Sequence, residues 1–144
     1  MKTVAVGVFA LTLLTGAVII GTGAISFVSP LYALAYLAVA ALLCGAVIAV
    51  FCTKCPMRGE GCVHFFPGRL AALLPARRGK YTAVEIAAVS VALLLIAAVP
   101  QYWLLSQVPL LALFWILAGT GIFLVLRRVC PGCGNRCCPL RPKE

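Results

Sequence analysis

Cysteine is the abundant reactive side chain in this chain of 144 residues. Eight cysteines contrast with one histidine and three acidic residues, a composition that excludes carboxylate dyads, two-histidine haem ligation and carboxylate-rich metal sites. Seven of the cysteines form two groups, each opened by a C-x2-C pair. The loop group contains Cys52, Cys55 and Cys62 with His64 beside it, and the tail group contains Cys130, Cys133, Cys137 and Cys138. The chemistry of the chain is therefore concentrated in two short segments.

These two groups together predict a metal centre. A C-x2-C turn presents two thiolates to one ion, and two such turns complete a tetrahedral site. The expected ligands are Cys52, Cys55, Cys62, Cys130, Cys133 and Cys138, with Cys137 and His64 as alternates. His64 either completes a Cys3His set with the loop cysteines or is an ordinary polar loop residue. The cofactor stays open between zinc and an iron-sulfur cluster.

Short motifs within the groups point to both cofactors. The segment Cys130-Pro-Gly-Cys133-Gly resembles the knuckle of zinc ribbons and rubredoxins. The cysteine-proline pairs at 55–56 and 138–139 resemble ferredoxin ligation instead. The chain is loosely similar to small mercuric-ion membrane transporters as well. Those use a cysteine pair within an early helix, whereas here only Cys44 lies in an apolar stretch, and we assign it no chemistry.

The composition places the chain in a membrane. Hydrophobic residues make up 64% and charged residues 10%, with a mean hydropathy of +1.13, against about 45–50% and about 25% in soluble domains. A hydrocarbon core takes about 20 helical residues to cross. Four uncharged apolar stretches have about that length, at 3–27, 31–51, 83–99 and 110–126. The predicted fold is all-α, an integral membrane four-helix bundle with a cysteine-rich cytoplasmic cap.

This prediction divides the chain into four parts. Residues 1–51 hold the first two membrane helices, 52–81 a cysteine-rich loop, 82–128 the last two helices and 129–144 a cysteine-rich tail. In the loop, Leu70, Leu73 and Leu74 share a helical face, so we expect a short helix there, lying in the headgroup layer. A T-x-x-E capping box formed by Thr82 and Glu85 predicts the start of the third span. We therefore interpret Glu85 as a helix cap and not as a proton relay.

Basic residues set the expected orientation. The segments 52–81 and 127–144 hold eleven lysines and arginines between them, whereas the connections around 26–30 and 100–109 hold none. The positive-inside bias then places both termini and the loop in the cytoplasm of a multi-pass cell-membrane protein. Lys2 with the following apolar run also fits a signal peptide, but the run is longer than the usual h-region, so we expect an uncleaved helix.

The expected function follows from this placement. Thiols in a reducing compartment favour bound metal over disulfides. We expect an electron-transfer or accessory subunit of a membrane assembly, without enzymatic activity of its own. Two alternatives stay open: a zinc-stapled structural membrane protein, and a thiol-disulfide oxidoreductase using Cys52/Cys55 or Cys130/Cys133. The expected partners are the lipid bilayer and other membrane subunits, not nucleic acid, and the sequence identifies no small-molecule substrate.

Overall fold

A computed structural model of the protein describes residues 2–59, 61–135 and 138, and its elements over these residues are all helical. Four helices are long and apolar enough to cross a membrane, with spans at Thr3–Ser26, Pro30–Lys54, Ala83–Leu104 and Val108–Val129. Their α-helical parts are α1 (Lys2–Ser26), α2 (Pro30–Val50), α4 (Ala83–Ala98) and α6 (Val108–Leu124). The sequence prediction of four apolar helices is confirmed, and each helix end lies within two residues of its expected place.

Four short elements join or extend these helices. They are η1 (Cys52–Lys54), α3 (Phe66–Leu73), α5 (Gln101–Leu104) and η2 (Val125–Val129). The short helix expected in the loop is therefore present as α3. Proline explains two of the helix starts, since it stands in the first turn of both α2 and α6, where its missing N–H costs no hydrogen bond. The Thr82–Glu85 capping box is formed at the start of α4, as predicted.

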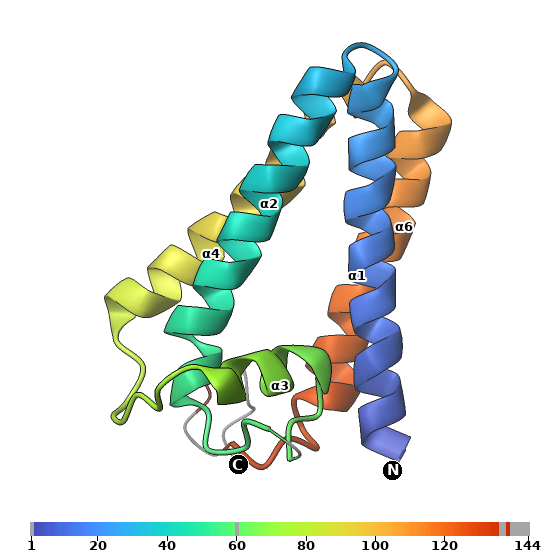
Figure 1. Ribbon diagram of the computed structural model, residues 1–144. Helices are drawn as coiled ribbons and strands as arrows, with labels where there is room; N and C mark the ends of the chain where they lie inside the picture. Colours follow the sequence, from blue (N-terminus) through green and yellow to red (C-terminus); the bar gives the residue numbers. More distant parts are fainter. Residues whose placement is uncertain (1, 60, 136–137, 139–144) are drawn as a thin grey trace.

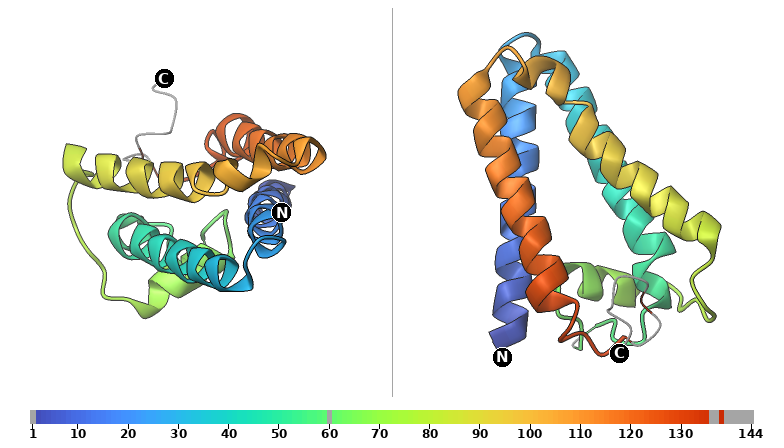
Figure 2. Two further views of the ribbon diagram at one scale, coloured as in Figure 1. Left: turned by 90° about the horizontal axis from the view of Figure 1, so that it is seen from above. Right: turned by 180° about the vertical axis from the view of Figure 1, so that it is seen from behind.

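The four long helices form two pairs. Helix α1 packs along α6 and α2 lies beside α4. The pairs meet near the turns that follow α1 and α5, and they separate toward the opposite end, where α3 crosses the opening between α1 and α2 (Figures 1 and 2). The loop after α2 and the tail after η2 both lie at this open end, which we call the cysteine end.

Small residues allow the closest helix contacts. The main core cluster consists of Ala17, Ala24, Leu104, Phe114 and Ala118. Such small residues let helix backbones approach where the hydrophobic effect does not drive helices together in lipid. The second pair is also fixed by a hydrogen bond across helices, since the Tyr36 hydroxyl donates to the Ile96 carbonyl oxygen over 2.8 Å.

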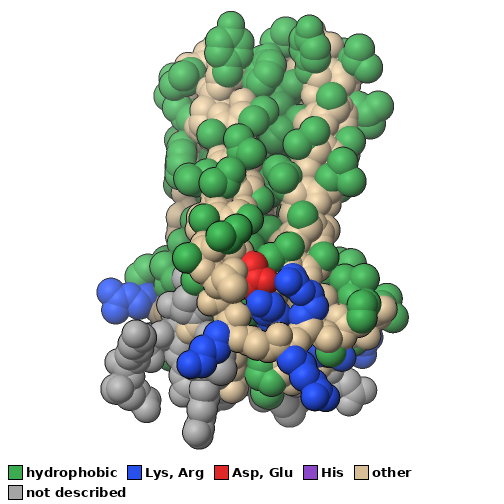
Figure 3. Space-filling view, turned by 90° about the vertical axis from the view of Figure 1, so that its left-hand side faces the viewer, with side chains coloured by type: hydrophobic (Ala, Val, Ile, Leu, Met, Phe, Trp, Pro, Cys, Tyr) green, Lys and Arg blue, Asp and Glu red, His purple; other side chains and the backbone are tan. Residues whose placement is uncertain are grey.

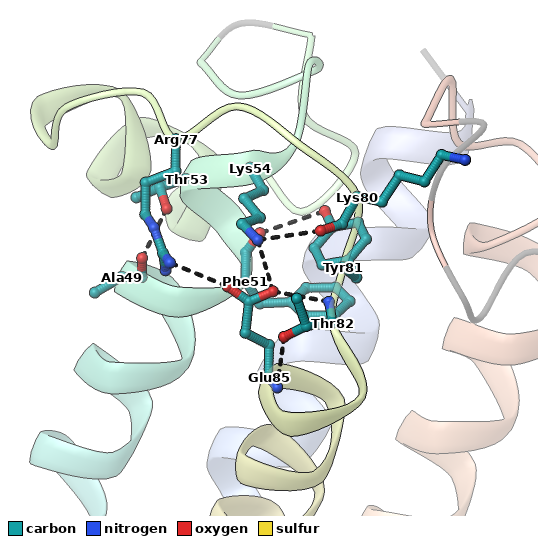
Figure 4. A network of polar contacts seen from close by, with 9 residues as sticks. All are labelled: Ala49, Phe51, Thr53, Lys54, Arg77, Lys80, Tyr81, Thr82 and Glu85. Carbon is teal, nitrogen blue, oxygen red and sulfur yellow. Dashed lines mark hydrogen bonds and ion pairs between the residues drawn. The ribbon is translucent and has the colours of Figure 1, made fainter.

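An ion-pair network ties the end of α2 to the start of α4 (Figure 4). Lys54 Nζ lies 2.6 Å from Glu85 Oε2, and the two side chains are only 7% and 11% exposed. Arg77 Nη2 lies 3.1 Å from Glu85 Oε1. The same carboxylate accepts the Thr82 N–H of the capping box. Glu85 is therefore more than a helix cap, because it also binds two cations from the cysteine loop.

The α1–α6 contact gives a test of the packing. A Cβ atom at Gly121 would lie 2.9 Å from Leu14 Cγ and 3.2 Å from the Ala10 carbonyl oxygen, whereas one at Gly119 would meet nothing within 4 Å. We expect Gly121→Val to lower the free energy of unfolding in detergent by about 1 to 3 kcal/mol because it overpacks this contact. The matched variant Gly119→Val should change it by about 0.5 kcal/mol or less. Equal effects would contradict the α1–α6 packing.

Candidate metal centre

Both C-x2-C turns directly follow a helix end. After α2, the chain tightens into η1, and the Cys55 N–H donates to the Cys52 carbonyl oxygen over 3.1 Å. After α6, the π-helical turn η2 ends with the Cys130 N–H donating to Val125 over 2.8 Å, and the Cys133 N–H donates to Cys130 over 3.2 Å. The same backbone hydrogen bond, from the last cysteine of the pair to the first, therefore closes both turns.

Thiols of the loop and the tail lie near one another. Burial raises the pKa of the Cys55 and Cys62 thiols, and the charge of nearby Cys133 raises the pKa of both further. Burial likewise raises the pKa of Cys130, with a further contribution from Cys138 and Cys133. Cys138 also interacts electrostatically with Cys52. Each C-x2-C group therefore has a neighbouring thiol from the other half of the chain.

Asn135 connects the tail to the loop. Its side chain is buried, and Nδ2 lies 3.2 Å from the Tyr81 hydroxyl and 3.5 Å from Cys55 Sγ. The backbone carbonyl oxygen of Asn135 accepts a hydrogen bond from the Cys138 N–H over 3.4 Å. Burial raises the pKa of Tyr81 to about 12, so the phenol stays protonated at neutral pH. Asn135 is thus a hydrogen-bond donor to a candidate ligand, of the type that orients metal-bound side chains.

Tyr81 in turn rests on the end of α2. Its ring stacks on Phe51 with 4.3 Å between centroids, and its hydroxyl donates to the Phe51 carbonyl oxygen over 3.3 Å. The ion pairs of Glu85 hold the same two segments together (Figure 4). Sequence reasoning missed the roles of Asn135 and Tyr81. The position of Asn135 among the tail cysteines was the one signal available in the sequence.

His64 and Cys137 are the remaining candidate ligands. His64 lines a cavity together with residues of α1, and burial lowers the pKa of its imidazole. Cys137 lies outside the described residues. Within residues 2–59, 61–135 and 138, no three His, Cys, Asp or Glu side chains are arranged as a group that could hold a metal ion. The described thiols are therefore neighbours and not a closed set of ligands.

The cysteine end carries the positive charge of the molecule. Figure 3 shows lysine and arginine side chains gathered there, while hydrophobic side chains cover the helices. Glu85 is the one acidic residue in the described part of the chain, and it is already paired with Lys54 and Arg77. A centre with four thiolates around Zn²⁺ has a net charge of −2, and the basic side chains at the cysteine end would compensate part of that charge.

Comparison with known proteins gives no family assignment. No protein-family model matches the chain, and no curated protein or solved structure matches it significantly.

The docking of the tail is open to a direct test. Replacing Asn135 by leucine keeps its size but removes both donated hydrogen bonds, at a cost of about 1 to 3 kcal/mol for the buried groups left unpaired. We expect the buried thiol of Cys130 to react with a maleimide about fivefold faster or more. Tyr81→Phe, which removes only one partner, should have a smaller effect. An unchanged rate in Asn135→Leu would show that this contact does not hold the tail.

The raised thiol pKa values predict a pH dependence. Because the folded protein favours the neutral thiols of Cys55, Cys62 and Cys130, their alkylation in metal-free protein at pH 8 should be slower than in the denatured chain. The folded state should lose stability as the pH rises through the usual thiol value of 9.0, since the unfolded chain then releases protons more readily. Faster alkylation of these thiols in the folded protein than in the denatured chain at pH 8 would contradict this arrangement.

Proposed function

We propose that this protein is a multi-pass membrane protein whose cysteine end binds a metal ion or an iron-sulfur cluster through thiolates of both the loop and the tail. Cys52, Cys55, Cys62, Cys130, Cys133 and Cys138 supply most of the ligands, and Cys137 and His64 are alternates. The single observation that carries the proposal is the contact of the tail with the loop, where Asn135, two residues after Cys133, places its Nδ2 atom 3.5 Å from Cys55 Sγ.

A bound cation would offset the repulsion between neighbouring thiolates at the cysteine end. Several half-buried thiols next to one another disfavour thiolates, because each negative charge is desolvated and repelled by its neighbours. A coordinated divalent ion reverses this balance and deprotonates its thiol ligands. The basic side chains at the cysteine end reduce the remaining negative charge of such a centre.

The raised pKa values of the thiols disfavour the alternative function, a thiol-disulfide oxidoreductase. A nucleophilic cysteine needs a lowered pKa, which basic neighbours or a helix N-terminus provide. Burial raises the pKa of Cys55, Cys62 and Cys130 instead. Both C-x2-C pairs also follow helix C-termini, where the helix dipole destabilises an anion. Metal ligation is therefore the better chemistry for these thiols.

The proposed role depends on the metal. Zinc would join the two halves of the chain and make the protein a structural or accessory subunit. An iron-sulfur cluster would give it an electron-transfer role. In either case we propose that the cysteine end faces the cytoplasm of a cell-membrane protein, since the positive-inside bias favours that orientation for the basic loop and tail.

Metal analysis of cysteine variants tests this function. The protein is purified in a mild detergent, and zinc, iron and acid-labile sulfide are measured together with the visible spectrum. We expect stoichiometric metal in the wild type and loss of about half of it or more in both Cys52→Ser and Cys130→Ser, because each removes a ligand from the shared centre. The matched control Cys44→Ser, which alters the exposed cysteine within α2, should keep its metal.

Two results would contradict the proposal. Metal-free wild-type protein with rapidly alkylated thiols would favour the oxidoreductase. Unchanged metal content in both Cys52→Ser and Cys130→Ser would show that the two halves do not build one centre.

A further inference from the structure

The cavity lined by His64 lies beside the cysteine end, on the flank of α1. It has a volume of about 440 Å³. One wall of the cavity is a stripe on α1 formed by Val8, Thr12, Thr15 and Ile19. One end of the cavity is formed by residues 64–66, just before and at the start of α3. The metal centre proposed above leaves this cavity without a role.

The wall on α1 is chemically apolar in spite of its threonines. The Thr12 hydroxyl donates to the Val8 carbonyl oxygen over 3.0 Å, and the Thr15 hydroxyl donates to Leu11 over 2.9 Å. Both side chains thus satisfy their own donors within the helix and expose their methyl groups to hydrocarbon without a polar penalty. The stripe runs through the first membrane span, so a molecule in the bilayer can reach it.

The length of the stripe matches one leaflet. From Val8 to Ile19 the helix rises by about 16 Å at about 1.5 Å per residue. The acyl chains of one leaflet fill about half of a hydrocarbon core of about 30 Å. An acyl chain lying along α1 would therefore extend from the cysteine end to the middle of the bilayer.

The end of the cavity contains a polar side chain, and an arginine lies next to it. His64 lines it, and the Phe65 ring beside His64 lies 4.2 Å below the guanidinium carbon of Arg69. The backbone of Phe65 has a positive φ of 38°, which non-glycine residues rarely adopt. In this conformation the guanidinium group of Arg69 stacks over the Phe65 ring. A close contact fixes this segment on α1, since a side chain at Gly7 would overlap the Val63 carbonyl oxygen. Arg69 itself remains exposed.

From this combination we propose that the cavity binds one anionic phospholipid. Its acyl chain lies along the Val8–Ile19 stripe, and its phosphate group pairs with Arg69. The occupant is a lipid and not a soluble phosphate, because the acyl chain supplies the contact with α1. The proposal does not depend on the metal centre.

Lipid retention tests this site. Full-length protein is reconstituted in nanodiscs that contain phosphatidylcholine and phosphatidylglycerol, released into detergent, and analysed by native mass spectrometry. We expect the wild type to retain one phosphatidylglycerol, and Arg69→Gln to reduce that retention about fivefold, as expected for one basic residue near the surface. Arg69→Lys keeps the charge and should retain most of the lipid. Soluble glycerol phosphate should not displace it.

Arg78→Gln is the matched control: Arg78 is an exposed arginine of the same loop, whereas Arg69 stacks on Phe65 of the cavity wall. Thr15→Phe fills the groove and should also reduce retention. Equal losses in Arg69→Gln and Arg78→Gln would overturn the proposal in favour of diffuse attraction, as would full retention in Arg69→Gln. Metal content is measured in the same samples and should stay unchanged, so the failure of this site is distinguishable from the failure of the metal centre.

Discussion

The contact between the tail and the loop is the interaction on which the proposed site depends. The chain is hydrophobic over four long segments, and its cysteines are divided between two places separated by two of those helices. Only a specific contact brings the two groups together at the open end of the helix pairs. The buried amide of Asn135, hydrogen-bonded to Tyr81 and Cys55, provides it. A buried amide with two defined partners fixes a geometry that apolar packing alone leaves loose.

The loop that receives this contact is held by the ends of α2 and α4. Glu85 binds Lys54 and Arg77 in a largely enclosed position, and Tyr81 stacks on Phe51 directly beside it. These interactions lie where the helix pairs have separated, so the helices alone do not close this end of the molecule. The polar network therefore joins the end of α2 to the start of α4, and with it fixes where the cysteine loop leaves and re-enters this helix pair.

The sequence predicted the features that depend on local chemistry. Hydrocarbon requires long uncharged helices, and the four spans could be located from that requirement alone. The Thr82–Glu85 capping box spans four residues and was equally visible. The cations that bind Glu85 were not predictable, because Lys54 is 31 residues away and its approach depends on how α2 and α4 pack. The same holds for Asn135 and Tyr81, which are 54 residues apart. The cavity lined by Thr12 and Thr15 was likewise not predictable, because its end is formed by residues 64–66 of a distant loop.

X-ray absorption at the metal edge tests the central claim most directly, because it counts the sulfur atoms around the ion. The proposed centre predicts four sulfur ligands at about 2.3 Å for either metal. It also predicts fewer sulfur ligands when cysteines of the loop alone, or of the tail alone, are replaced. A first shell of oxygen and nitrogen atoms, or a sulfur count that only one of the two cysteine groups can change, would contradict it.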